Sequence, residues 1–206
     1  MSALSTRPEI DEELPLEFAE EEQSLKITGF WLFLVTDVLI FASLFSSYAV
    51  YQPMVAQGPT AFQLFHLGPV ILETLILLTS SFTVGIAVWA MRRQRVAMLK
   101  AWLIFTLLLG AAFVGIELHE FIGDVAMGAS WRTSAFLSSF FLLVSTHGAH
   151  VTFGIIWALS LLVQLARRGL TAVTARKIYT FSLYWHFLDI IWVFIFTFVY
   201  LGGKIL

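Results

Sequence analysis

The chain has 206 residues, of which 59% are hydrophobic and 13% charged, and its formal net charge is −2. Soluble domains have about a quarter of their residues charged, so this composition predicts an integral membrane protein. The sequence contains no cysteine, which excludes disulfides, iron–sulfur clusters, thiolate haem ligation and thiol catalysis. The small net charge and the lack of a basic cluster argue against nucleic-acid binding.

The N-terminal segment, residues 1–24, is polar and acidic, and it predicts a flexible cytoplasmic tail ahead of a membrane domain at 25–206. It lacks the basic start and apolar core of a signal peptide, so we expect it to be retained. Eight of the 14 acidic residues fall in the first 25 positions: Glu9, Asp11, Glu12, Glu13, Glu17, Glu20, Glu21 and Glu22.

Five apolar stretches follow, at about 27–51, 69–91, 101–122, 135–165 and 179–201. Each is close to the roughly 20 residues that a helix needs to cross a bilayer. They lack the alternation of a barrel strand, so the sequence predicts an all-α bundle of five transmembrane helices. The first connection, residues 52–68, contains two prolines and two glycines and is expected to be a loop.

The basic residues predict the orientation of the bundle. Only Arg132 and Lys204 fall on the side of the first and third connections. The positive-inside rule therefore places the N-terminus in the cytoplasm and the C-terminus on the periplasmic side. The ten basic residues assigned to the cytoplasmic side are Arg7, Lys26, Arg92, Arg93, Arg95, Lys100, Arg167, Arg168, Arg176 and Lys177.

Ionisable side chains stand near the middle of three spans. Asp37 lies in the first span, a His-Gly-x-His motif in the fourth, and a Trp-His-Phe-x-Asp motif in the fifth. An ionised group at this depth costs about 3 kcal/mol on insertion scales, so each needs a partner. Interhelical hydrogen bonds explain these residues with the fewest assumptions, and a proton path is the alternative. The midplane set is Asp37, His147, His150, His186 and Asp189.

Three further acids, Glu73, Glu117 and Glu120, are expected to converge near the outer ends of the second and third spans, with His119 turned away from Glu117. Metal binding is poorly supported, because a His pair at i and i+3 needs ligands from another helix. The di-iron Glu-x-x-His pattern is absent from the sequence. A haem between His186 and His147 or His150 is conceivable, but the spacing does not require it. We therefore expect no catalytic, cofactor-binding or metal-binding residue in this chain.

The chain resembles subunit III of the haem–copper respiratory oxidases, in the five-span form found with bo-type cytochrome ubiquinol oxidases. The resemblance covers nearly all of the membrane part. It is carried by residues 29–37 (GFWLFLVTD), 70–74 (VILET), 115–121 (GIELHEF), 138–141 (SSFF), 146–151 (THGAHV), 164–171 (QLARRGLT) and 185–189 (WHFLD), with Trp192.

This resemblance implies an accessory role in a terminal oxidase of the bacterial cytoplasmic (inner) membrane. In the family, two haems and a copper ion belong to subunit I, whereas subunit III binds phospholipid and supports assembly and proton uptake. The implied partners are subunits I and II and a small subunit IV. The five-span form favours quinol over cytochrome c as the electron donor. Asp37 stands where the family most often has Glu, and we add that Arg167 and Arg168 could bind lipid headgroups.

Overall fold

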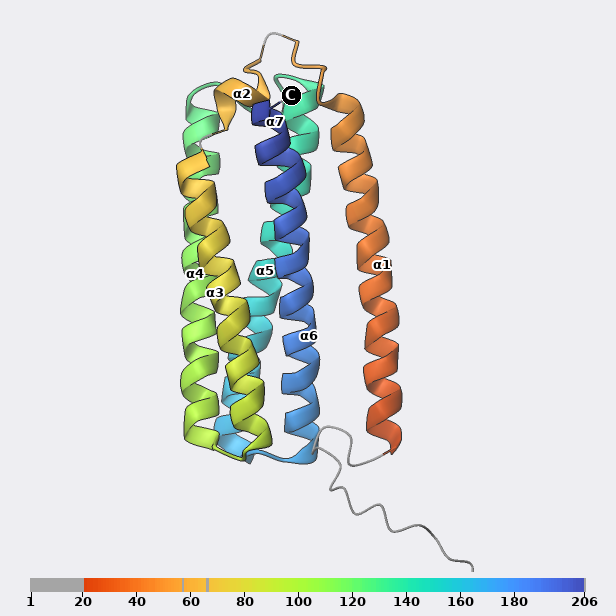
Figure 1. Cartoon of the computed structure of the whole chain (residues 1–206), viewed down its shortest axis with the longest axis vertical. Coiled ribbons are helices and arrows are strands. Elements are labelled where there is room, and N and C mark those ends of the chain that lie inside the picture. The colour runs from red at the N-terminus through yellow and green to blue at the C-terminus, as the bar shows by residue number, and fades with distance from the viewer. Residues whose placement is uncertain (1–20, 57, 66, 206) are drawn as a thin grey trace, which may run out of the picture.

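The computed structural model describes residues 21–56, 58–65 and 67–205, with side chains described from Lys26 to Lys204. Its long helices are α1 (Glu21–Tyr51), α3 (Leu67–Arg92), α4 (Val96–Ala126), α5 (Ala135–Arg168) and α6 (Ala172–Phe194) (Figure 1). Within these ranges five helices are long and apolar enough to cross a membrane. The predicted five-span, all-α fold is therefore confirmed.

Several helix ends differ from the predicted spans. The third span was expected at 101–122 but is helical from Val96 to Ala126, and the fifth begins at Ala172 rather than near 179. At 1.5 Å per residue the 31 residues of α4 extend about 46 Å, whereas the hydrocarbon core is about 30 Å thick. The helix therefore continues into the headgroup region, where polar residues are tolerated and apolar composition no longer marks its limits. Of the predicted tail, 1–20 lie outside the described residues and 21–24 belong to α1.

The connection after α1 was expected to be a loop throughout, and this prediction was wrong in part. A short helix, α2 (Ala61–Leu64), forms within it, and α3 already begins at Leu67. The Thr60 and Gln63 pair of a capping box explains this turn, because the Gln63 side chain accepts a hydrogen bond from the Thr60 backbone N–H at 3.1 Å. The segment therefore lies against the end of the bundle, where Ala61, Leu64 and Phe65 are buried.

Four of the long helices form a closed ring, in which α3 packs on α4, α4 on α5, α5 on α6, and α6 on α3. Helix α1 lies outside this ring and packs against α5 and α6, at the right in Figure 1. After α6 the chain continues as a π-helical segment, Ile195–Leu201, which is followed by the short helix α7 (Gly202–Ile205). Helices α5 and α6 thus each contact three long helices, and α6 joins α1 to the ring together with α5.

Close approach of α6 to the ring depends on two glycines. A Cβ added at Gly110 of α4 would lie 2.8 Å from the Trp185 ring, and one at Gly154 of α5 would lie 2.9 Å from it. The indole therefore fills the space that both glycines leave open. Two other small residues of these helices do not play this part. Gly115 has no heavy atom within 4 Å of an added Cβ, and Ala149 is exposed.

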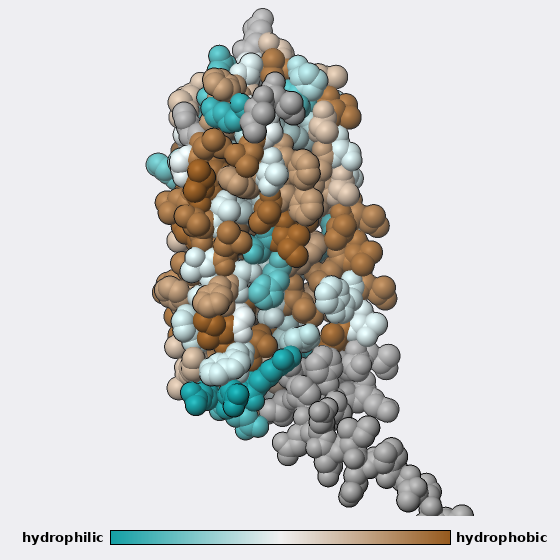
Figure 2. All heavy atoms as spheres, viewed as in Figure 1, coloured by the Kyte–Doolittle hydropathy of each residue, from teal (hydrophilic) through white to brown (hydrophobic). Residues whose placement is uncertain are grey.

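The outer surface is largely apolar, as the brown spheres in Figure 2 show. Hydrophilic residues gather at the lower end in that view, where the α3–α4 and α5–α6 connections and the start of α1 lie. Two guanidinium groups there, those of Arg93 and Arg95, stand over the Trp89 ring at 5.7 and 6.0 Å from its centroid. This end of the bundle is basic and aromatic, as an interface with lipid headgroups requires.

Candidate functional site: polar groups within the membrane helices

His186 and Asp189 of α6 both meet Ser81 of α3. The Ser81 hydroxyl and His186 Nδ1 are hydrogen-bonded at 2.7 Å, and the Asp189 carboxyl group lies close enough to the same hydroxyl to interact with it, although its Oδ1 has no partner within the described residues. Both α6 side chains are half-buried, whereas Ser81 is buried. The two ionisable residues share a helix face as expected, but a serine from a neighbouring helix joins them. The sequence pattern alone did not single out this serine.

His147 of α5 is fully buried and points toward α6. Its Nε2–H donates to the Leu188 carbonyl at 3.2 Å, while its Nδ1 has no partner within the described residues. The ring lies 5.2 Å from that of Trp192 and 5.7 Å from that of Phe113. Such an aromatic enclosure holds the imidazole in one orientation.

Asp37 of α1 lies on another side of α6, near His150 and Tyr184. It is only 4% exposed, is close enough to both residues to interact electrostatically, and its Oδ2 has no described partner. His150 donates from Nδ1 to the Thr146 carbonyl at 2.7 Å, and the Tyr184 hydroxyl donates to the His150 carbonyl at 3.0 Å. The aromatic ring of Phe41 covers the imidazole at 5.2 Å.

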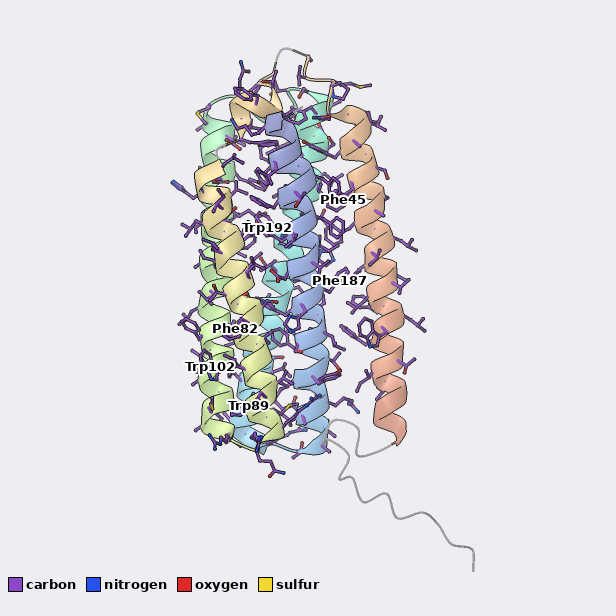
Figure 3. All side chains as sticks on the ribbon, viewed as in Figure 1. Phe45, Phe82, Trp89, Trp102, Phe187 and Trp192 are labelled. Carbon is purple, nitrogen blue, oxygen red and sulfur yellow. The ribbon has the colours of Figure 1, made fainter. Side chains whose placement is uncertain are left out.

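The expected midplane set therefore divides into three places around α6. His186 and Asp189 face α3, His147 faces the ring interior, and Asp37 with His150 lies toward α1. In Figure 3 the label of Trp192 stands on the α3 side of α6, and the label of Phe187 stands on the α1 side. The arrangement holds α6 to its neighbours at several points.

The acids at the outer ends of α3 and α4 do come together. Glu73 is 1% exposed and Glu117 is 5% exposed, and both lie within electrostatic reach of Glu120. Neither carboxylate oxygen of Glu73 has a described partner. Gly148 of α5 makes room for the group, because a Cβ there would lie 2.6 Å from Glu117 Oε2.

Two further residues extend this cluster and were not singled out from the sequence. Asp124 follows Glu117 and Glu120 on one face of α4, and the buried Tyr200 of the π-helical segment interacts with the acids. Glu120, Asp124 and Tyr200 line a cavity of about 240 Å³, which His119 borders as well. The spacing 117, 120, 124 is helical and was the signal available in the sequence.

Metal ligation finds no support within the part of the chain that the structure describes. No three His, Asp or Glu side chains there are grouped so that they could hold an ion. The three imidazoles of α5 and α6 are engaged separately, with Ser81, with the Leu188 carbonyl and with the Thr146 carbonyl. What these groups can do chemically is hydrogen-bond between helices and carry protons.

Other polar contacts of α6 were also missed from the sequence. Trp185 Nε1–H donates to Ser80 at 2.9 Å, and Trp192 Nε1–H donates to Thr74 at 3.0 Å, both on α3. With Ser81, these hydroxyls form a column along the α3 face that meets α6. Serine and threonine spaced six and seven residues apart inside an apolar helix were the pattern that could have identified it.

Comparisons with known proteins agree with this architecture along its whole membrane part. The family model described as cytochrome c oxidase subunit III matches residues 19–204. The chain is 51% identical over 189 residues to quinol oxidase subunit 3 of Bacillus spizizenii, covering 92% of this chain and 93% of the relative. It is 48% identical over 179 residues to cytochrome bo(3) ubiquinol oxidase subunit 3 of Pseudomonas aeruginosa, covering 87% and 86%.

A relative named for another electron donor is similar as well. The chain is 46% identical over 180 residues to cytochrome c oxidase subunit 3 of a Bacillus species, covering 87% of each chain. The relatives are bacterial, and with five spanning helices the chain is a multi-pass protein of the bacterial inner membrane. The resemblance found in the sequence is confirmed: the chain belongs to the cytochrome c oxidase subunit III family.

Proposed function

We propose that this chain is the accessory subunit III of a terminal quinol oxidase, the complex that couples quinol oxidation to reduction of oxygen to water and to proton translocation. The observation that carries the proposal is 51% identity to a quinol oxidase subunit 3 over nearly the full length of both chains. The dispersed polar contacts around α6 fit a scaffolding part better than a catalytic one. Haems and copper would reside in subunit I, and the complex is hetero-oligomeric.

The partners of this chain would be subunits I and II, a small subunit IV, and phospholipid. An apolar groove of about 500 Å³ between α1 and α5 suits an acyl chain, being lined by Phe30, Phe33, Phe153, Ile156, Trp157 and Ser160. Arg167 and Arg168 are exposed in the last turn of α5, toward the same end of the bundle. We assign them to lipid headgroups, since guanidinium groups bind phosphate well.

The proposed topology has the N-terminus and its acidic tail, residues 1–24, in the cytoplasm. Its support is the gathering of basic side chains at the bundle end where α1 begins. The described C-terminal residues lie at the opposite end, which this topology places on the periplasmic side.

A proton-relay role is the second candidate, and the position of Asp37 favours it. This carboxyl group is buried beside His150, and His150 interacts electrostatically with His147. Under this alternative, Asp37, His147, His150, His186 and Asp189 would feed protons to the oxidase. The division of these groups among three sides of α6 favours a structural role instead.

The first test is isolation of the tagged chain from membranes in mild detergent. We expect co-purified haem, quinol:oxygen activity and little oxidation of reduced cytochrome c. Stripping the partners should remove the haem bands of the reduced-minus-oxidised spectrum. Haem bands that stay with the stripped chain would contradict the proposal, and oxidation of cytochrome c alone would assign the chain to the other donor class.

A further inference from the structure

A polar patch interrupts the apolar outer surface between α3 and α6. Figure 2 shows hydrophilic spheres there at mid-height, among brown and white neighbours. An open groove of about 380 Å³ lies at this place, and Ser81 and His186 form its polar part. We name it the α3/α6 groove; its remaining lining residues, all on α3, are Phe82, Gly85, Ile86 and Trp89.

The imidazole of His186 is incompletely bonded in this groove. Its Nδ1 is engaged by Ser81, and no hydrogen bond occupies Nε2 within the described structure. The residue is half-exposed at the depth of the hydrocarbon core. Lipid chains cannot hydrogen-bond, so a polar group facing them is costly. A helix that packs in this apolar groove and brings one hydrogen-bonding group of its own would satisfy the free nitrogen of His186.

Other exposed polar side chains of the bundle do not create the same need. The hydroxyls of Ser43, Ser47, Thr79, Thr146 and Ser160 each donate to a carbonyl three or four residues earlier in their own helix. These groups are satisfied within one helix and can face lipid. His186 has no comparable carbonyl partner among the described contacts, which distinguishes it from these five hydroxyls.

Gly85 makes the groove accessible to a second backbone. It is exposed, and an added Cβ would meet no heavy atom within 4 Å. Between the bulkier Phe82 and Trp89, whose positions on α3 are labelled in Figure 3, it leaves a shallow notch. Small residues beside a polar group are typical of contacts between membrane helices, where van der Waals packing and hydrogen bonds replace the hydrophobic effect.

We propose that the α3/α6 groove is the docking site for a transmembrane helix of a partner oxidase subunit, whose hydroxyl or amide side chain hydrogen-bonds His186. The inference rests on the proposed function, which places the chain in an oxidase complex. A hydroxyl or amide suits either tautomer of the imidazole, because each can donate and accept. The partner backbone packs at Gly85, and Phe82 and Trp89 flank it.

Site-specific crosslinking tests the contact directly, because the chain has no native cysteine. Phe82→Cys, labelled with a sulfhydryl-reactive benzophenone in the intact complex, should crosslink to another oxidase subunit. Leu159→Cys is the matched control, since it is exposed at a similar distance from the inner end of α5, across the ring from α3. Adducts at position 82 with lipid alone, or with a second copy of this chain, would overturn the proposal.

Filling the notch gives an independent test that leaves the Ser81–His186 bond intact. Gly85→Leu should weaken retention of the chain in detergent-washed complex about tenfold, which corresponds to about 1.4 kcal/mol. Gly115→Leu, at an equally open glycine of α4, should retain the complex. Unchanged retention of Gly85→Leu, or equal loss in both variants, would contradict the docking site. Failure of the parent chain itself to co-purify with oxidase subunits would instead refute the proposed function.

Discussion

Glu117 of α4 lies directly against Gly148 of α5, so that a Cβ at position 148 would stand 2.6 Å from one carboxylate oxygen and 2.8 Å from the other. The helix crossing and the position of a buried carboxyl group are therefore set together. We expect Gly148→Ala to displace Glu117 and to destabilise the chain by about 1–3 kcal/mol, the usual cost of overpacking. Thermal unfolding of the purified complex measures it, with Gly115→Ala as the control at an open position.

The Trp185 contact predicts a second sensitive site. Gly154→Ala would bring a methyl group within 2.9 Å of a buried indole held on its other side by Gly110. The ring cannot move toward α4, so we expect a loss of about 1–3 kcal/mol and a lower midpoint of thermal unfolding. An unchanged midpoint would show that α5 and α6 can move apart near Trp185 without loss of stability.

The hydrogen bond between Trp192 and Thr74 can be measured with a double-mutant cycle. Trp192→Phe and Thr74→Val each remove one partner of the 3.0 Å contact. Interhelical hydrogen bonds in membranes couple by about 0.6 kcal/mol on average, so we expect a coupling energy of about 0.5–1.5 kcal/mol. Additive effects of the two substitutions on the free energy of unfolding would mean that the contact contributes no net stability.

Asp37→Asn separates the structural role from the relay. The amide keeps the volume of the side chain and can hydrogen-bond, but it cannot transfer a proton as the carboxyl group does. We expect the variant complex in proteoliposomes to pump protons with an unchanged proton-to-electron ratio. Asp189→Asn should behave alike, because its amide also keeps the volume and the hydrogen-bonding capacity of the carboxyl group. A lower ratio in a complex that retains the chain would establish the relay.

The lipid assignment predicts a change in bound phospholipid. Replacing Arg167 and Arg168 together by glutamine removes two exposed cationic groups at one end of α5. We expect the purified complex to carry fewer phospholipid molecules and to lose activity sooner during turnover. Arg132→Gln, at the opposite end of the bundle, is the matched control and should leave the lipid content as it was.

The sequence predicted the five helices well because their physical cause is local. A run of about 20 apolar residues forms a helix in lipid whatever its neighbours are. The convergence of Glu73, Glu117 and Glu120 was also predictable, since helix period and depth place them on facing surfaces. The family was predictable from two motifs, His-Gly-x-His in the fourth span and Trp-His-Phe-x-Asp in the fifth.

The partners of these residues could not be predicted, because they depend on how the helices rotate about their axes. Depth alone placed Asp37, His147, His150, His186 and Asp189 in one set, whereas the rotations of α1, α5 and α6 divide them. Ser81 was overlooked for the same reason, since a hydroxyl can bond its own helix and need not mark a contact. Gly115 and Gly148 look equivalent in sequence, yet only the second lies under another side chain.

The place of α1 outside the helical ring has a consequence for synthesis. This helix enters the membrane first, but its main neighbours, α5 and α6, are made last. Until they arrive, Asp37 faces lipid without His150, at a cost of about 3 kcal/mol if ionised. Since the ring of α3 to α6 makes its contacts without α1, we expect the first helix to be synthesised to be the last to reach its place. We expect its docking to complete assembly of the subunit.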